Sequence, residues 1–386
     1  MSLKTSRRGA IAPFFVMDVM RAAYEREVAG HDVLHMEVGQ PGTAAPQPVR
    51  DAAKAALDAD RIGYTGAFGL PQLRKRLSEY YLEFYGEVVP EQRIVVTTGS
   101  SAGFVLSFLA VFDAGDRVAL ASPGYPAYRN ILKALDVEPV ELLVGPETNY
   151  QPTPELLDGL EGQLDGLIIA SPSNPTGTML PEAELRALAE YCQERNIRLI
   201  SDEIYHGVTY GVQSKTALAF NDQAIVVNSF SKYFSMTGWR LGWMVVPENL
   251  LRPIECLSQN LFISPPTLSQ LAGIAAFDCR PQLDSYVASY ARNRSLLLEK
   301  LPLAGFDKLS NPDGAFYLYA DVSDMTNDSV QFCKRILDEA SVAVTPGIDF
   351  DPERGNRYVR FSFAESYDVI EQAADRLINW KRQEQS

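Results

Sequence analysis

Short apolar runs alternate with longer amphipathic segments through the middle of the chain. Each run is soon followed by serine, glycine, proline or asparagine, which favour turns. The runs lie at residues 94–96, 117–121, 166–170, 198–200 and 224–227. Short apolar runs bounded by turn residues predict buried strands. Their alternation with helical segments between residues 93 and 246 predicts an α/β domain with a mainly parallel sheet flanked by helices.

The two ends of the chain have a different pattern. Apolar residues at helical spacing over residues 13–29 predict an arm followed by a helix, and residues 33–38 predict a short strand. After Pro253 we expect helices at 282–301, 329–340 and 367–382, with strands at 315–322, 342–345 and 357–363. This mixture predicts a smaller α+β domain.

The length of 386 residues supports a division into domains, because single hydrophobic cores rarely serve chains of more than about 300 residues. We expect a large domain at residues 46–285. The small domain is expected to comprise residues 286–386, together with part of an N-terminal arm at residues 1–45.

Polar residues and glycines follow the predicted strands at the point where the chain leaves the sheet. The carboxyl ends of parallel strands meet at one edge, where α/β proteins bind their ligands. The segments at this edge are Thr98–Gly103, Ser122–Pro126, Ser171–Gly177 and Ser201–Tyr205. The first of these opens a helix, and its free N–H groups with the hydroxyls of Ser100 and Ser101 suit a phosphate.

The stretch 228–243, with the sequence NSFSKYFSMTGWRLGW, follows the apolar run 224–227 and leads into another at 241–246. Lys232 lies in its polar loop, with Ser229, Ser231 and Arg240 close by in sequence. A desolvated lysine amine can form a Schiff base with an aldehyde. Hydroxyl and guanidinium groups are suitable donors for a phosphate dianion. This combination predicts a site for pyridoxal phosphate (PLP).

Each of these residues also has a purely structural explanation when it is considered alone. A lysine between strands usually lies at the surface, and the serines before a helix can serve only as its cap. Asp202 can cap a turn, and Arg360 in the alternating strand 357–363 can point into solvent. Their shared position at the strand ends is what favours a common site.

Composition narrows the function further. The formal net charge of −14 argues against nucleic acid or an anionic membrane as a partner. The longest apolar run, at 104–112, is too short to span a bilayer, and the N-terminus lacks the pattern of a secretory signal. Four widely spaced cysteines without CxxC pairing and three histidines without HxxxH spacing indicate neither a metal site nor a disulfide framework. We therefore expect a cytoplasmic protein without a metal.

Three motifs carry a resemblance to a known family: SPSNPTG at 171–177, SDEIY at 201–205 and SFSKYFSMTGWRLGW at 229–243. In this order and spacing they resemble the class I/II aminotransferases of the PLP-dependent fold-type I superfamily. The resemblance extends from about Ile11 to the last helix. It implies the PLP-dependent transferase fold and an aminotransferase (transaminase) that moves an amino group between an L-amino acid and a 2-oxo acid.

The resemblance also implies roles around the cofactor. Lys232 is expected to form the Schiff base with PLP, the internal aldimine, and later to act as the base for the substrate α-proton. Asp202 is expected to pair with the pyridine nitrogen, while Tyr205 and Asn174 hold the ring oxygen. The residues expected at the ring face and the phosphate are Tyr125, Ser100, Ser101, Ala102, Ser229, Ser231 and Arg240.

Substrate and subunit contacts follow from the same resemblance. Arg360, with Gly39 and Asn174, is expected to bind the substrate α-carboxylate. Tyr64 looks like the tyrosine that reaches the phosphate of a neighbouring subunit, which implies a homodimer with shared active sites.

Two departures from the family bear on the substrate. Related bacterial aspartate-type enzymes carry a lysine, which pairs with the distal carboxylate, at the position of Ser101. The arm, which lines the side-chain pocket in relatives, carries Phe14 and Phe15 in place of small polar residues. Both features favour a donor with a neutral or aromatic side chain.

Two other functions are compatible with parts of the pattern. A PLP-dependent carbon–sulfur β-lyase on the same fold shares every motif, so only assays separate it from an aminotransferase. A non-catalytic PLP-binding regulator is the remote alternative, since such proteins carry an N-terminal DNA-binding domain and little chain precedes Pro13.

Overall fold

The computed structural model describes residues 3–59 and 62–384. A seven-stranded sheet with the order β2-β8-β7-β6-β5-β3-β4 forms its centre. The strands are β2 (Ile94–Thr97), β3 (Arg117–Ser122), β4 (Glu138–Leu143), β5 (Gly166–Ala170), β6 (Arg198–Asp202), β7 (Ile225–Ser229) and β8 (Gly242–Val245). Only β8 is antiparallel to its neighbours β2 and β7. The mainly parallel sheet predicted from the sequence is confirmed.

Successive residues of the central strands pack into separate cores on the two faces of the sheet. Leu167 and Ile169 belong to one core and Ile168 to the other, as the alternation of side chains along a strand requires. The first core is covered by α3 (Pro71–Tyr85), α7 (Glu182–Glu194) and α9 (Thr267–Ala276). The second is covered by α4 (Gly99–Val111), α5 (Pro126–Ala134) and α8 (Leu251–Leu261). Burial on both faces explains why successive positions such as Leu167, Ile168 and Ile169 are all apolar.

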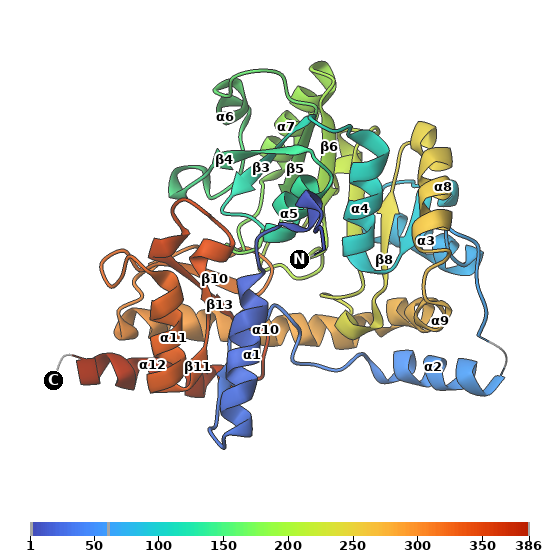
Figure 1. Cartoon of the computed structure of the whole chain (residues 1–386). Helices are drawn as coiled ribbons and strands as arrows, with labels where there is room; N and C mark the ends of the chain where they lie inside the picture. The colour runs from blue at the N-terminus through green and yellow to red at the C-terminus, as the bar shows by residue number, and fades with distance from the viewer. Residues whose placement is uncertain (1–2, 60–61, 385–386) are drawn as a thin grey trace.

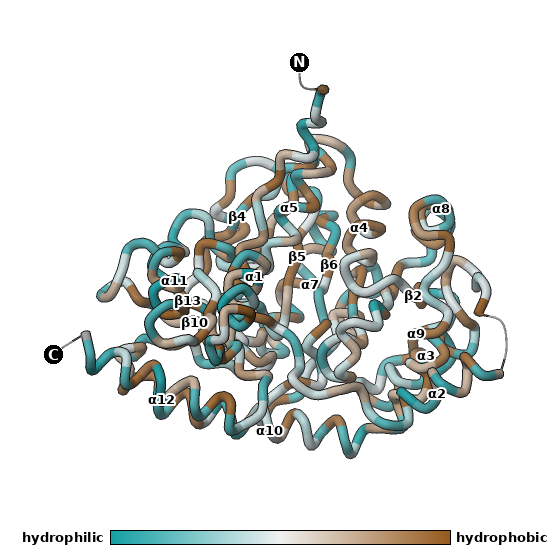
Figure 2. Tube along the Cα trace, turned by 60° about the horizontal axis from the view of Figure 1, so that its bottom comes forward, coloured by the Kyte–Doolittle hydropathy of each residue, from teal (hydrophilic) through white to brown (hydrophobic). Residues whose placement is uncertain are grey.

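A second, antiparallel sheet has the order β12-β13-β10-β9 and lies beside the first (Figure 1). Its strands are β9 (Lys308–Leu309), β10 (Tyr317–Asp321), β12 (Thr345–Pro346) and β13 (Tyr358–Ser362). The helices α10 (Arg280–Lys300), α11 (Ser329–Ala340) and α12 (Tyr367–Glu384) surround it, and the short helix α6 (Pro154–Asp158) lies near β4 in the large part (Figure 1). Figure 2 shows hydrophobic and hydrophilic positions alternating along α12, as expected for a helix with one buried face.

The N-terminal segment joins this smaller part of the molecule. Strand β1 (Leu34–His35) pairs in parallel with β11 (Val342–Ala343). Helix α1 (Phe15–Val28) contacts β11 and β12, whereas α2 (Gln47–Ala59) packs against α9 of the large part. Within the described residues, no helix is both long and apolar enough to cross a membrane.

The structure corrects several predicted boundaries. Only residues 34–35 of the strand expected at 33–38 pair with another strand, and the expected strand 342–345 is divided between two sheets. Strand β4 was not predicted, because its Glu138 and Pro139 obscure the apolar pattern at the edge of the sheet. The domain boundary expected at residue 285 falls inside α10, and the division into domains remains a prediction.

Candidate active site

A cavity of about 520 Å³ opens at the carboxyl ends of the parallel strands, between the large sheet and α1. Residues from five loops of the large part, from α1 and from the small sheet line it. The predicted site residues among them are Phe14, Gly39, Ser100, Ser101, Tyr125, Asn174, Asp202, Tyr205, Ser231, Lys232, Arg240 and Arg360. The parallel arrangement of the strands is what brings these distant segments of the chain together.

Lys232 lies in the loop after β7 and reaches into the cavity. Its Nζ donates a hydrogen bond of 2.6 Å to the carbonyl oxygen of Gly39. The loop is held by bonds of its own, from the Ser231 N–H to Ser229 Oγ and from Thr237 Oγ1 to the Ser231 carbonyl. Burial lowers the pKa of Lys232 to about 8, and the charge of Arg360 adds to the effect. The amine is therefore partly neutral near physiological pH.

Asp202, the last residue of β6, is only 3% exposed. Its Oδ2 accepts a hydrogen bond from the Tyr128 hydroxyl, and its Oδ1 accepts one of 3.1 Å from the Ile204 N–H. Burial raises the pKa of Asp202 to about 6, while these hydrogen bonds and Lys232 act in the opposite direction. A carboxylate in this setting favours a cationic partner from the cavity.

Tyr205 and Tyr317 meet through their hydroxyl groups, 2.6 Å apart and buried in the wall of the cavity. Tyr317 also approaches Gly39 closely, since a Cβ at that glycine would lie 1.7 Å from the Tyr317 hydroxyl oxygen. Only glycine therefore allows the backbone at position 39 to pass this ring and offer its carbonyl to Lys232.

Arg360 on β13 points into the cavity and is 3% exposed. Its Nη1 donates a 2.8 Å hydrogen bond to Asn174 Oδ1, and its Nη2 donates to the carbonyl of Glu37 and to Thr345 Oγ1. The guanidinium lies over the ring of Tyr317, 4.4 Å from the centroid, and its Nε has no hydrogen-bond partner. A buried guanidinium with an unused donor is suited to bind a carboxylate.

The opposite end of the cavity is built around the start of α4. Gly99 has a φ of +73°, and a Cβ there would lie 2.5 Å from Arg240 Nη2. Ser100 and Ser101 follow in the first turn of the helix, whose N–H groups have no partner within it. Arg240 itself has a left-handed backbone, with φ 50°, and remains exposed. This arrangement of N–H groups, hydroxyls and a guanidinium suits a phosphate.

Comparison with known protein families identifies the family to which this chain belongs. A family model described as aminotransferase class I and II matches residues 31–377. The chain belongs to the class I and II aminotransferases.

Individual relatives agree with this assignment. A valine–pyruvate aminotransferase from Mycobacterium tuberculosis is 50% identical over 384 residues, which are 98% of this chain and 99% of the relative. The crystal structure of an aminotransferase from the same organism matches with a TM-score of 0.97 and 49% identity, covering 99% of this chain and 100% of that one. The aspartate aminotransferase from Thermus thermophilus with maleate matches with a TM-score of 0.92 and 32% identity, covering 98% and 100%. The predicted PLP-dependent transferase fold is confirmed.

Class I and II aminotransferases depend on PLP, which is therefore the cofactor of this aminotransferase. The cavity has complementary groups for each part of that molecule. Gly99 lets the guanidinium of Arg240 approach the start of α4, where both can bind a phosphate, and Asp202 is a buried carboxylate for the pyridine nitrogen. Lys232 provides a partly neutral amine for the aldehyde.

Four predicted site residues of this aminotransferase do not line the cavity of their own chain. Ala102 and Ser229 are buried just behind its surface, and Phe15 lies beside Phe14 but outside the lining. Tyr64 is 83% exposed. Its neighbour Thr65 is bound to α9 through Gln270, so the loop is held on its own chain with this ring in solvent.

Other lining residues of the aminotransferase were not predicted from the sequence. They are Val16, Met17, Met20, Val38, Tyr128, Ala170, Pro172, Ile204, Thr237 and Tyr317. Met17 and Met20 have helical spacing from Phe14, which was the only local signal for them. Tyr128 and Tyr317 belong to patterns typical of core residues, and nothing in the sequence distinguishes them from packing aromatics.

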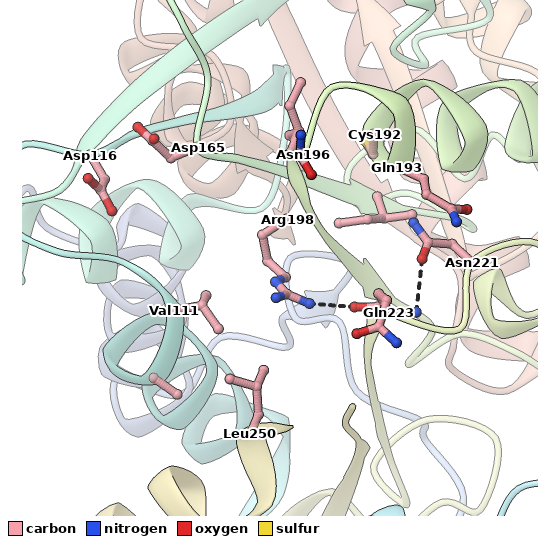
Figure 3. Close-up of a pocket in the computed structure, with 13 residues that line it drawn as sticks. Val111, Asp116, Asp165, Cys192, Gln193, Asn196, Arg198, Asn221, Gln223 and Leu250 are labelled. Carbon is pink, nitrogen blue, oxygen red and sulfur yellow. Dashed lines mark hydrogen bonds between the residues drawn. The ribbon is translucent and has the colours of Figure 1, made fainter. Parts of the chain in front are cut away.

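A second cavity of about 590 Å³ lies at the opposite edge of the same sheet (Figure 3). It is lined by Asp116, Asp165 and Arg198, which mark the amino ends of β3, β5 and β6. The guanidinium of Arg198 is already bound to the carbonyl of Gln223 at 2.6 Å. The lining contains neither a lysine nor a predicted site residue, so the first cavity is the candidate active site.

Proposed function

We propose that Lys232 is the residue that binds PLP covalently and moves the substrate α-proton. PLP supplies an electron sink for the negative charge that develops at the substrate Cα. With a pKa of about 8, a minority of Lys232 is neutral at neutral pH, far more than for an exposed lysine, and in this form Nζ can accept the proton and return it to another carbon. The hydrogen bond to the Gly39 carbonyl orients the amine toward the cavity.

The other predicted residues hold the cofactor in this proposal. Asp202 pairs with the pyridine nitrogen and keeps it protonated, while Tyr205 and Asn174 donate to the ring oxygen. Tyr125 covers the ring face, and the start of α4 with Arg240 binds the phosphate. The support is their convergence on one cavity, with Asp202 and Arg360 both buried.

Arg360 binds the α-carboxylate of the substrate, assisted by Asn174 and Gly39. Arg360 lines the cavity, and the contacts to Asn174, Glu37 and Thr345 fix the guanidinium plane. A two-pronged contact from a fixed arginine orients both the amino acid and the 2-oxo acid in the same way. The same site then serves both halves of the transamination.

We propose that the donor is an amino acid with a neutral, apolar side chain. The observation that carries this is the wall formed by Phe14, Val16, Met17, Met20 and Val38 at one side of the cavity. Its cationic lining residues are Lys232, Arg240 and Arg360, which the proposal already uses. A desolvated side-chain carboxylate without a partner costs several kcal/mol. The 50% identity to a valine–pyruvate aminotransferase makes valine and pyruvate the first pair to test.

The test is a panel of amino donors measured with pyruvate and with 2-oxoglutarate. We expect kcat/KM for valine, alanine or phenylalanine to exceed that for aspartate by at least about tenfold, since an unpaired buried carboxylate costs more than 1.4 kcal/mol. Ser101→Lys adds a cation at the cavity. It is expected to raise kcat/KM for aspartate relative to kcat/KM for alanine. A clear preference of the unmodified enzyme for aspartate contradicts the proposal, whereas ammonia release from a sulfur-containing donor identifies a β-lyase.

We also propose a homodimer in which Tyr64 completes the site of the partner. The support is the exposure of Tyr64 on a loop that is held to its own chain, together with the exposure of Arg240 at the phosphate end of the cavity. A phosphate site open to solvent on one side gains a further donor if a second chain covers it.

The proposed compartment is the cytoplasm. The four cysteines are all free, and three of them are buried. Such cysteine usage is typical of proteins in reducing compartments.

A further inference from the structure

The first turn of α1 is held by a carboxylate from the other end of the chain. Asp349 lies in the short 3-10 helix Gly347–Asp349, which follows β12. Its Oδ1 accepts a 3.1 Å hydrogen bond from the N–H of Phe15, and its Oδ2 accepts one of 3.1 Å from Val16. These are the first two residues of α1, where N–H groups have no partner within the helix. Asp349 therefore caps α1 in place of a local residue, since Phe14 provides no side-chain cap.

The helix that Asp349 caps forms the apolar wall of the cavity. Val16, Met17 and Met20 of α1 line the cavity, as does Phe14 just before the helix. The ring of Phe14 lies edge-on to that of Tyr125, with 6.0 Å between the centroids. The N-terminal half of α1 thus forms one side of the cavity.

The attachment of α1 is divided between its two halves. Ala23 packs with Leu337 and Ala343 of the small part, and Arg26 forms an ion pair with Asp338 near the C-terminal end of the helix. At its N-terminal end, α1 is attached to the small part by the two hydrogen bonds that Asp349 accepts. Asp349 is 2% exposed, and its own backbone carbonyl accepts a hydrogen bond from buried Arg129.

A carboxylate is well suited to this position. The N-terminal end of a helix carries partial positive charge, so it favours an anion. Burial raises the pKa of Asp349, whereas the N–H groups of Val16 and Phe15 act to lower it. Burying a charged group is unfavourable unless its hydrogen bonds are satisfied, and here the satisfying donors belong to α1.

We propose that Asp349 is a specificity-positioning residue, which fixes the start of α1 so that Val16, Met17 and Met20 form a defined wall for an apolar substrate side chain. This inference rests on the proposed function, in which the donor carries a neutral side chain. The side-chain class that the wall fits is aliphatic and longer than a methyl group. The methyl group of alanine extends one carbon from Cα and makes little use of the wall.

Asp349→Asn tests the proposal with little change in shape. One of its two acceptors becomes an NH₂ group, which faces a backbone N–H and cannot bind it. We expect KM for valine to rise about tenfold, as loss of a hydrogen bond to a charged group implies. The values of kcat for valine and KM for alanine are expected to change less than about threefold, because the reacting atoms are not touched.

Asp351→Asn is the matched control. Asp351 is 1% exposed, lies in the same segment and accepts hydrogen bonds from the N–H groups of Glu353 and Arg354. It has no bond to α1. We expect this variant to lose stability without a change in the valine-to-alanine ratio of kcat/KM. A ratio that changes equally in both variants, or in neither, overturns the proposal.

Two further measurements test the contact between Asp349 and α1 without relying on the choice of substrate. Phe15→Pro removes the N–H that Asp349 binds, at a first helical position that tolerates proline, and Phe15→Ala controls for the side chain. Hydrogen exchange in Asp349→Asn is expected to accelerate at the first turn of α1 but not in Asp351→Asn. Absence of that acceleration rejects the attachment itself, whereas a clear preference of the unmodified enzyme for aspartate rejects the proposed function alone.

Discussion

At the scale of single residues, Asp202 and Tyr128 form a buried pair beside the cavity. Burial raises the pKa of Asp202 to about 6, and the hydrogen bond from Tyr128 opposes this rise because it stabilises the ionised form. In the proposed mechanism only the ionised carboxylate can pair with a protonated pyridine nitrogen. We therefore expect Tyr128 to affect catalysis through its hydrogen bond to Asp202.

Tyr128→Phe is expected to reduce kcat/KM at pH 7 by about tenfold, since hydrogen bonds to charged groups contribute about 1.5–3 kcal/mol. The acidic limb of the pH profile should move to higher pH, because without the hydroxyl Asp202 protonates more readily. Tyr319→Phe serves as the control, since the Tyr319 hydroxyl is buried without a hydrogen-bond partner. If the pH profile of Tyr128→Phe coincides with that of the unmodified enzyme, Tyr128 does not tune Asp202.

At the scale of secondary-structure elements, α1 and β1 are joined by a histidine between two carboxylates. His35 on β1 lies 2.8 Å from Glu37 Oε1 through Nδ1 and 3.2 Å from Glu27 Oε1 of α1 through Nε2. Glu37 also offers its backbone carbonyl to Arg360. The link therefore connects the arm helix with the segment that fixes the proposed carboxylate-binding arginine.

This link should depend on pH. The hydrogen bond to Glu37 is the main cause that raises the pKa of His35 from 6.5 to about 9, and burial acts in the opposite direction. Because the folded-state pKa is raised, the stabilisation is fully present below pH 6.5 and is lost as the pH rises through about 9. We expect the Tm difference between the unmodified protein and His35→Gln to be constant below pH 6.5 and to shrink up to about pH 9. A difference that does not vary with pH excludes a protonated His35.

At the scale of the whole molecule, each active site of the proposed dimer contains residues from both chains. Lys232 would come from one chain and Tyr64 from its partner. Tyr64 is 83% exposed in the single chain, so its contribution to catalysis requires that second chain.

Mixing an inactive variant with one that binds PLP weakly tests this arrangement. Lys232→Ala lacks the proposed reactive amine, and Tyr64→Ala is expected to bind PLP about tenfold more weakly through loss of a phosphate hydrogen bond. A hybrid dimer contains one chain of each variant. One of its sites combines the unmodified Lys232 with the unmodified Tyr64, and the other site carries both substitutions. After the variants are unfolded and refolded together, activity at a low PLP concentration should therefore exceed that of either variant refolded alone, and sedimentation should show dimers. An active monomer, or no recovery in verified hybrids, contradicts shared sites.

The local sequence determined the central strands of the large sheet, though not its edge strand β4, and the residues at its ligand-binding edge. Runs such as 166–170 and 224–227 are apolar throughout because both faces of their strands are buried, so their position could be predicted. The carboxyl ends of parallel strands coincide, so Asp202, Lys232 and the start of α4 could be assigned to one site before any distance was known. The resemblance then added Arg360, whose own pattern left inward and outward directions open.

Tertiary structure alone decided which partners these residues have. Tyr128 reaches Asp202 across 74 residues of sequence, Asp349 binds α1 across more than 330, and Tyr317 meets Tyr205 across 112. The apolar wall likewise depends on where α1 lies against the small part. Periodicity and spacing describe neighbours along the chain, whereas these contacts arise from the packing of whole elements, so no local pattern contains them.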